Sequence, residues 1–349
     1  MTLDLLRAFI TGLWLFLNLF NRKGMTDSDD HRKLRLVAWL LPLCLIVPLM
    51  LVAFIPWSGV GLFFWITFAG VIYLETSRLF RLAIGFTSTR SRSTPVPGLE
   101  SLVVTTRALQ VRTYEFGEAP RSLHGLSVAF VSDLHCDGTP SCAWYDRLWE
   151  TVRGIGPDLL ILGGDYLSRA DSLPILDRAL KELRTLHPAL GIWAVLGNHD
   201  LEAPDAVRRI LRQAGCEILE DSWVALDRGE GRFVVLHGTG APWTTSNSPA
   251  ASLPPGGVDI SVSHTPDNAP ALAKGGARYI LSGHIHAGQI ALPVFGAILS
   301  PSLHARRWTY GCHTLDNSRL VVTSGTGVVA LPLRILASPE IVLLRFWSE

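Results

Sequence analysis

The sequence predicts an α/β fold with a mainly parallel sheet in its last two thirds, preceded by a separate helical region. Short apolar runs there have the length and the β-branched content of buried strands, and they span residues 126–131, 158–162, 191–196, 258–262 and 277–281. Segments with helical spacing of apolar residues follow the first three runs, at 142–152, 173–186 and 205–214. Strands that alternate with helices favour a parallel sheet, whose ligand sites lie at the carboxyl ends of the strands.

A short polar motif follows each of these apolar runs. In chain order the motifs are Asp133-Leu134-His135, Gly164-Asp165, Gly197-Asn198-His199-Asp200, Ser263-His264 and Gly283-His284-Ile285-His286. Each is weak alone, because a single His at a strand end is more often a hydrogen-bonded structural residue than a ligand. Together they supply carboxylate, imidazole and amide ligands for two divalent cations. Such a pair lowers the pKa of a shared water, and the resulting hydroxide attacks phosphorus in line.

In type and order, these motifs resemble those of the calcineurin-like metallophosphoesterases. Within that family the resemblance is greatest to the bacterial YkuE and YaeI-like branch, which is related to UDP-2,3-diacylglucosamine pyrophosphatases. Further shared segments are 109–114, 283–290, 324–327 and 331–334, so the resemblance covers roughly residues 100–347. It implies a metallophosphoesterase four-layer α/β/β/α sandwich, here expected over residues 99–349.

The same resemblance implies how the ligands are divided. Asp133, His135 and His286 would hold one metal ion. Asn198, His264 and His284 would hold the other, with Asp165 bridging. His199 is expected to be the catalytic imidazole, which binds a phosphate oxygen or protonates the leaving oxygen, and Asp200 is expected to help by orienting its ring. Mixed imidazole and carboxylate ligation without thiolate favours Mn, Fe or Zn over a purely Mg site.

The expected activity is that of a membrane-associated dimetal phosphoesterase that hydrolyses a phosphodiester or pyrophosphate bond by attack of a metal-bridging hydroxide. The expected substrate is a phosphorylated small molecule or a lipid-linked nucleotide, with UDP-2,3-diacylglucosamine of lipid A biosynthesis as the specific candidate that the resemblance implies. The alternative is a non-catalytic metal-binding scaffold of the same fold. The intact ligand set and His199 favour the enzyme. No residue pattern indicates an oligomeric state.

Other signals in the chain point to no second chemistry. Gly325–Ala330 formally matches a dinucleotide fingerprint, but Pro332 and Pro339 leave no room for the helix that this motif requires. The net charge of +1 gives no basic field for nucleic acid, and five cysteines without close pairing indicate reduced thiols. Trp243 lies in a Pro- and Gly-rich loop at 238–257, where a substrate contact and a plain surface excursion are equally plausible.

The amino-terminal region, residues 1–81, is expected to bind the lipid bilayer. Residues 36–55 carry no charge and are long enough to cross a bilayer, and 59–75 form a second apolar run. Residues 3–20 predict an interfacial helix or a short span. Cationic residues flank the two runs on both sides, which places the catalytic domain in the cytoplasm, at the bacterial inner membrane. The Ser-, Arg- and Pro-rich segment 82–98 predicts a linker.

Overall fold

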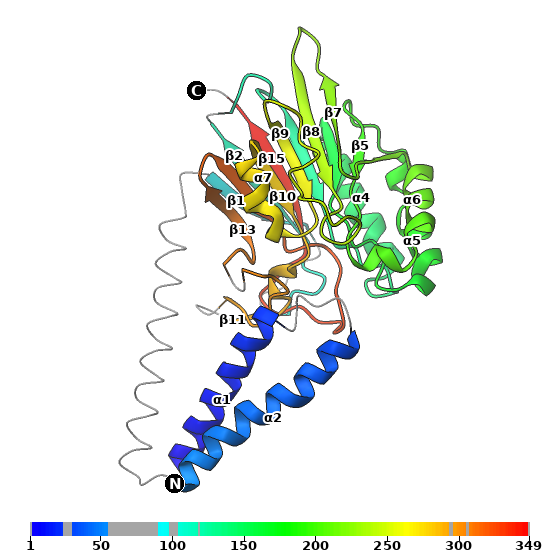
Figure 1. The fold of residues 1–349 in the computed structure, drawn as a ribbon. Helices are drawn as coiled ribbons and strands as arrows, with labels where there is room; N and C mark the ends of the chain where they lie inside the picture. The colour runs from blue at the N-terminus through cyan, green and yellow to red at the C-terminus, as the bar shows by residue number, and fades with distance from the viewer. Residues whose placement is uncertain are drawn as a thin grey trace. The chain divides into compact units, whose positions relative to one another are not determined.

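The computed structural model describes residues 2–23, 30–54, 90–97, 104–117, 119–292, 296–304 and 307–347. The chain divides into two compact units (Figure 1). The first contains residues 1–86 and 298–307, and the second, which carries the polar motifs, contains residues 87–297 and 308–349.

The second unit contains two large sheets with mostly parallel strands. The first sheet has the order β1-β2-β15-β3-β4-β5-β6. Its strands are β1 (Arg90–Pro95), β2 (Gln110–Phe116), β3 (Ser127–Val131), β4 (Leu159–Leu162), β5 (Ile192–Ala194), β6 (Cys216–Ile218) and β15 (Glu340–Phe346). Strands β3 to β6 are parallel, while β15 runs antiparallel to β3 and parallel to β2. The carboxyl-terminal strand therefore closes a gap in the sheet that the amino-terminal half leaves open.

The second sheet has the order β13-β14-β10-β9-β8-β7. Its strands are β7 (Ser222–Asp227), β8 (Phe233–Thr239), β9 (Val258–Ser263), β10 (Ala277–Ser282), β13 (Gly311–Leu315) and β14 (Ser318–Val322). The four central strands are parallel and the two outer pairs are antiparallel hairpins. A short third sheet pairs β11 (Ala291–Leu292) with β12 (Gly296–Ala297). Local periodicity predicts a mainly parallel sheet and the resemblance implies two sheets, and the five predicted strands are indeed distributed over two.

Alternation of side chains along each strand produces separate hydrophobic cores. In β3, Val128 and Phe130 face the second sheet, whereas Ala129 and Val131 face the helices. Because side chains alternate with a period of two, a strand buried on both faces must be apolar along its buried length, as β4 and residues 128–131 of β3 are. The core between the sheets contains Leu236, Ile260 and Leu281 from the second sheet.

Helices cover the outer faces of both sheets. On the first sheet lie α4 (Cys142–Ile155), α5 (Leu173–Ala179) and α6 (Pro204–Gln213), and on the second lies α7 (Ala269–Lys274). In α4 the buried side chains follow the helical period, and Gly156 ends the helix in the left-handed conformation. The helix expected at 173–186 is shorter, because a 3₁₀ turn at Leu183–Thr185 follows α5. The helices lie outside two sheets that share a core, which is the α/β/β/α layer order that the resemblance implies.

The first unit contains α1 (Thr2–Lys23) and α2 (Asp30–Phe54), which pack through Phe16 and Cys44. Large apolar side chains elsewhere on the two helices are exposed, among them Leu6, Ile10 and Trp39. The described helices include none with the length and hydropathy of a membrane span. The span expected at 36–55 falls largely within α2, and the one expected at 59–75 lies outside the described residues. In the expected linker, Arg90–Pro95 form β1, which pairs with β2.

Candidate metal centre

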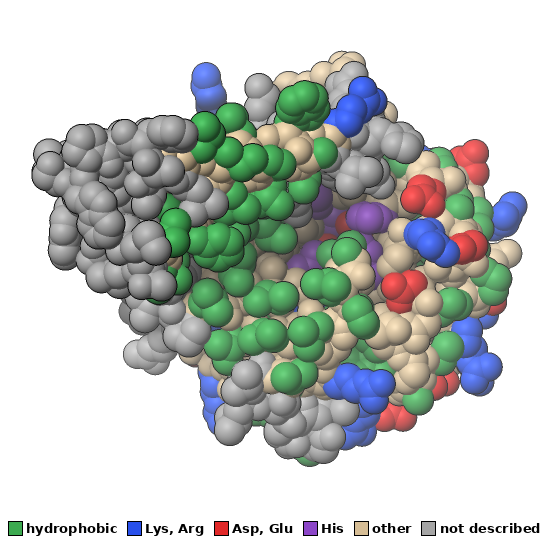
Figure 2. Space-filling view, turned by 90° about the horizontal axis from the view of Figure 1, so that it is seen from below, with side chains coloured by type: hydrophobic (Ala, Val, Ile, Leu, Met, Phe, Trp, Pro, Cys, Tyr) green, Lys and Arg blue, Asp and Glu red, His purple; other side chains and the backbone are tan. Residues whose placement is uncertain are grey.

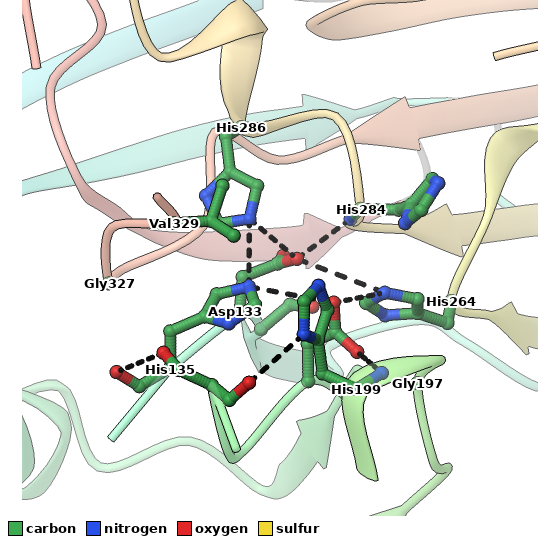
Figure 3. A network of polar contacts seen from close by, with 12 residues as sticks. Asp133, His135, Gly197, His199, His264, His284, His286, Gly327 and Val329 are labelled. Carbon is green, nitrogen blue, oxygen red and sulfur yellow. Dashed lines mark hydrogen bonds and ion pairs between the residues drawn. The ribbon is translucent and has the colours of Figure 1, made fainter. Parts of the chain in front are cut away.

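The predicted ligand residues meet at one end of the two sheets, in the loops that follow the carboxyl ends of their parallel strands. Asp133 and His135 follow β3, Asp165 follows β4, and Asn198 follows β5. From the second sheet, His264 follows β9, while His284 and His286 follow β10. Figure 3 shows the rings of His135, His264 and His286 around the Asp133 carboxylate, and in the space-filling view His side chains lie in a hollow of the surface (Figure 2).

Ligand atoms of this cluster form three groups that could each hold a cation; the third, His135 with Asp165 and His199, connects two groups that share no residue. Of these two, the first contains Asp133, His135 and His286, and the second contains Asp165, His264 and His284; within each group the ligand atoms lie within 4.8 Å of one another. The two groups are adjacent, since His135 Nε2 lies 3.5 Å from Asp165 Oδ2. The geometry therefore offers two neighbouring cation positions.

Backbone groups fix the orientation of several of these side chains. His264 Nδ1 lies 2.7 Å from the carbonyl oxygen of Gly163, so that Nε2 faces Asp165 Oδ2 at 3.0 Å. Each carboxylate accepts a hydrogen bond from a backbone amide of another motif. His284 N donates to Asp133 Oδ1, and His199 N donates to Asp165 Oδ1, each at 2.9 Å. A partner on the remote ring nitrogen or carboxylate oxygen is typical of metal ligands.

Two buried acceptor atoms support the fit of cations to this centre. Within the described residues, Asp133 Oδ2 and Asn198 Oδ1 have no hydrogen-bond partner, although both atoms are buried. A buried polar atom without a partner destabilises the folded state by about 1–3 kcal/mol. Oxygen and imidazole donors of this kind suit borderline divalent cations, so the residues present fit two such ions.

Burial and mutual charge set the protonation of the cluster. Burial lowers the pKa of His135 to about 3 and raises that of Asp133 to about 6. For His264 burial also lowers the pKa, but the adjacent Asp165 carboxylate outweighs it and raises the pKa to about 9. The His135 ring is therefore neutral, as a metal ligand must be. His264 carries a proton between Nε2 and Asp165, where a cation would replace it.

His199 lies at the edge of the cluster with its ring 4.9 Å from that of His135. Its Nδ1 is 3.2 Å from the carbonyl oxygen of Ser168, which fixes the ring. Asp200 is the other expected catalytic residue. Its buried carboxylate accepts hydrogen bonds from the amides of Asp165, Tyr166, Leu167 and Gly197. It holds the two strand-end loops together, and its hydrogen bonds go to these amides rather than to the His199 ring.

Trp243 lies against the second group, with its ring centroid 5.1 Å from that of His284 and 5.6 Å from that of His264. The loop that carries it is anchored, because Asn268 Nδ2 donates to the carbonyl oxygen of Ala241 at 2.7 Å. Of the two sequence-based interpretations, the structure favours a residue beside the site over a surface excursion.

The glycine of the last strand-end motif and Gly325 allow backbone to approach the Asp133 carboxylate. A Cβ at Gly283 would lie 2.3 Å from Asp133 Oδ2, and one at Gly325 would lie 2.7 Å from the Asp133 Cβ. The segment Gly325–Ala330 therefore forms part of the wall of the metal centre. It leads into turns and coil rather than a helix, which agrees with the rejection of a dinucleotide fingerprint.

Two residues with structural roles at this centre escaped the sequence analysis. Arg334 is fully buried and donates to His286 Nδ1 at 3.1 Å. Gln289 is buried and bonds to the backbone of Val329 and Leu331. Both lie in segments without periodic pattern, and the available signal was only that each falls in a shared segment of the resemblance, Gln289 in 283–290 and Arg334 in 331–334.

Comparison with known proteins agrees with this geometry. Residues 126–288 match the family model for calcineurin-like phosphoesterases. The uncharacterized metallophosphoesterase YkuE of Bacillus subtilis is 25% identical over 236 residues, which cover 66% of this chain and 82% of the relative. The phosphodiesterase YaeI of Escherichia coli is 26% identical over 225 residues, covering 62% of this chain and 81% of the relative.

A third similar protein is the UDP-2,3-diacylglucosamine pyrophosphatase LpxG of Chlamydia trachomatis. It is 36% identical over 78 residues, which cover 22% of this chain and 23% of the relative. The match to the family model contains every strand-end motif. The chain therefore carries a calcineurin-like metallophosphoesterase domain, and the enzyme class is that of a phosphoric ester hydrolase.

Proposed function

We propose that this protein is a membrane-associated dimetal phosphoesterase that cleaves a phosphodiester or pyrophosphate bond. The observation that carries the proposal is the pair of adjacent ligand groups, Asp133 with His135 and His286, and Asp165 with His264 and His284. We assign one cation to each group, add Asn198 to the second, and give Asp165 the bridging position between them.

Two cations of the Mn, Fe or Zn type, when bound, would supply a nucleophilic hydroxide from water and offset the charge on phosphorus. The chain's own residues do the rest. Asp133 and Asp165 are held by opposing backbone amides, so they need no reorganisation during turnover. His199, fixed through Nδ1 by the Ser168 carbonyl, is placed to donate a proton from Nε2 to the leaving oxygen. Trp243 forms a wall beside His264 and His284.

Exposed apolar side chains near the centre support a substrate with acyl chains. In the catalytic unit, Leu292, Leu331 and Leu336 are exposed large hydrophobic residues. Their loops adjoin the His286 segment, because Ile290 pairs with Ile335 and Gln289 bonds to the carbonyl oxygen of Leu331. The pyrophosphatase named among the relatives acts on UDP-2,3-diacylglucosamine, and we propose this lipid-linked nucleotide as the substrate candidate.

Membrane association of the enzyme is supported by the exposed apolar residues of α1 and α2, together with the cationic residues that flank the apolar runs. We therefore propose a bacterial inner-membrane location with the catalytic domain facing the cytoplasm.

The test is hydrolysis of three substrates by the purified chain with added Mn²⁺, Fe²⁺ or Zn²⁺: a bis-aryl phosphodiester, a nucleoside monophosphate and UDP-2,3-diacylglucosamine. We expect turnover of the diester and the lipid-linked pyrophosphate, and loss of at least 100-fold in Asp165→Asn, as removal of a bridging ligand implies. Equal activity in that variant would identify a contaminant. Metal binding without turnover of any substrate would favour the scaffold alternative.

A further inference from the structure

Trp243 is a partly exposed residue beside the second ligand group. Its ring centroid lies 5.1 Å from that of His284 and 5.6 Å from that of His264. These two imidazoles lie together on one side of the cluster, with their centroids 5.2 Å apart (Figure 3). A substituent of a phosphate held at this group therefore has the indole as its neighbouring wall.

The loop around Trp243 holds the indole in place before any ligand arrives. The amides of Trp243 and Thr244 both donate to the carbonyl oxygen of Gly240, at 3.1 Å and 3.0 Å, and close a turn. A Cβ at Gly240 would lie 1.7 Å from Thr244 Oγ1, so this turn requires glycine. Asn268 fixes the next residue through the Ala241 carbonyl oxygen. A group that binds to a wall already in place loses less of its affinity to ordering.

The indole leaves room for a parallel stacking partner. The planes of the His284 and His264 rings are tilted from it by 57° and 59°, and within the described residues no aromatic ring is stacked on Trp243. The surrounding groups are carboxylates and imidazoles, so a flat apolar surface is unusual among them. Aromatic rings pair best in offset-stacked or edge-to-face arrangements, and a planar ring of the substrate fits such a surface.

The exposed leucines that we propose contact acyl chains adjoin the other ligand group. Leu331 belongs to the loop that Gln289 anchors, three residues after His286, and His286 is a member of the first group. Trp243 contacts two members of the second group instead. The two apolar surfaces thus adjoin different halves of the centre, as the two ends of a molecule with a base and acyl chains on opposite sides of a diphosphate require.

We propose that Trp243 is the platform on which the nucleobase of the substrate stacks, and that it determines the preference of this site for nucleotides. The inference rests on the proposed function, because it takes a phosphate to bind at the second ligand group. It adds an orientation, with the nucleoside toward His264 and His284 and the acyl chains toward His286. Stacking of one base on an aromatic side chain raises affinity by a factor of about 5–100.

The experiment compares three monophosphates as competitive inhibitors of bis-aryl phosphodiester hydrolysis by the Mn²⁺-loaded full chain. They are UMP, dihydro-UMP and ribose 5-phosphate. All three have the same phosphate and ribose, and dihydro-UMP keeps the polar groups of the base on a saturated, puckered ring that cannot stack flat. We expect UMP to inhibit about 5–100-fold more tightly than either of the others. An inhibition constant stays defined if a monophosphate is itself slowly hydrolysed.

Three variants assign the preference to the indole. Trp243→Leu keeps an apolar side chain but removes the ring, and we expect the preference for UMP over ribose 5-phosphate to disappear. Trp243→Phe keeps a ring and should retain most of it. Trp223→Leu is the matched control, because Trp223 is 49% exposed on β7, at the edge of the second sheet, and should keep the full preference. Metal analysis of each variant measures whether both cations stay bound.

Equal inhibition by UMP and dihydro-UMP in the original protein would overturn the stacking role, and this comparison needs no variant to fold. An unchanged preference in Trp243→Leu would also overturn it, because an acyl chain would tolerate leucine whereas a stacked base would not. Equal loss in Trp223→Leu, or loss of Mn²⁺ from Trp243→Leu, would show a structural effect instead. Failure of the original protein to bind Mn²⁺ or to hydrolyse the diester would contradict the proposed function itself.

Discussion

Backbone strain is concentrated at the ligand residues. Asp133, Asp165 and His284 have φ of 59°, 54° and 68°, and His135 and His286 are also left-handed. This conformation costs an L-residue about 1–2 kcal/mol, so it persists only where surrounding contacts determine it. Asp200 supplies such contacts by accepting four backbone amides from the loops that carry Asp165 and Asn198. The left-handed backbone at these positions turns the ligand side chains of the strand-end loops toward the metal centre.

At the scale of a single residue, replacing His199 with Gln tests its role as proton donor. We expect turnover to fall about 10²–10⁴-fold, the range of general acid catalysis, while bound metal is unchanged because the ring lies outside the two main ligand groups. Kinetics on the bis-aryl phosphodiester, together with metal analysis of the same sample, gives both quantities. Loss of a cation from this variant would show that His199 is a ligand, as its proximity to His135 and Asp165 permits.

At the scale of elements, the parallel centre of the second sheet contains a buried histidine remote from the ligands. His237 of β8 lies between Ser261 Oγ of β9, at 2.8 Å, and Ser252 Oγ, at 2.9 Å. Burial lowers its pKa from 6.5 to about 4. Between these values the unfolded chain binds a proton that the folded chain does not bind, so the free energy of unfolding decreases as the pH falls through this window.

The prediction is that His237→Gln removes this contribution. Between pH 7.5 and pH 5 the original protein should lose about 2 kcal/mol more of its unfolding free energy than the variant, from 1.36 kcal/mol per pKa unit. Urea unfolding of chelator-treated protein at the two pH values measures the difference. Other buried histidines titrate in both proteins and cancel. An equal pH dependence of the two proteins would show that His237 is protonated without cost in the fold.

The loops around β11 and the segment before β15 carry the exposed leucines that we propose contact acyl chains. Leu331→Ser with Leu336→Ser should raise the KM for UDP-2,3-diacylglucosamine about 10-fold or more, since burial of each large apolar side chain is worth about 1.5–3 kcal/mol. The kcat/KM for the bis-aryl phosphodiester should stay unchanged. A parallel loss on both substrates would indicate damage to the metal centre instead, because Gln289 connects this segment to the His286 loop.

At the scale of the whole molecule, the two units allow the membrane proposal to be tested separately from catalysis. In flotation with vesicles that contain anionic lipid, we expect the full chain to move with the lipid. A chain that begins at residue 88, and so keeps β1, should stay in the aqueous fraction and still hydrolyse the bis-aryl phosphodiester. Retention of lipid binding by the shortened chain would place the membrane contact outside the amino-terminal helices, in the catalytic unit or in residues 298–307.

Much of this protein was readable from the order of its residues. The five strands and the polar motifs that end them were predictable, because a buried strand must be apolar on both faces and a loop at its carboxyl end is free to carry ligands. The same holds for the helices 142–152 and 205–214, whose apolar spacing survives in α4 and α6. The enzyme class followed from the motifs together with the resemblance.

Only the tertiary structure decided how these pieces are combined. The division of the strands between two sheets, and the insertion of β15 between β2 and β3, depend on pairings between segments far apart in sequence, which local periodicity does not encode. Arg334 illustrates the same point for one side chain. It lies 48 residues from His286, in a loop without pattern, and nothing but three-dimensional packing brings its guanidinium to that imidazole. Local sequence specifies which groups are available, and long-range packing specifies which of them meet.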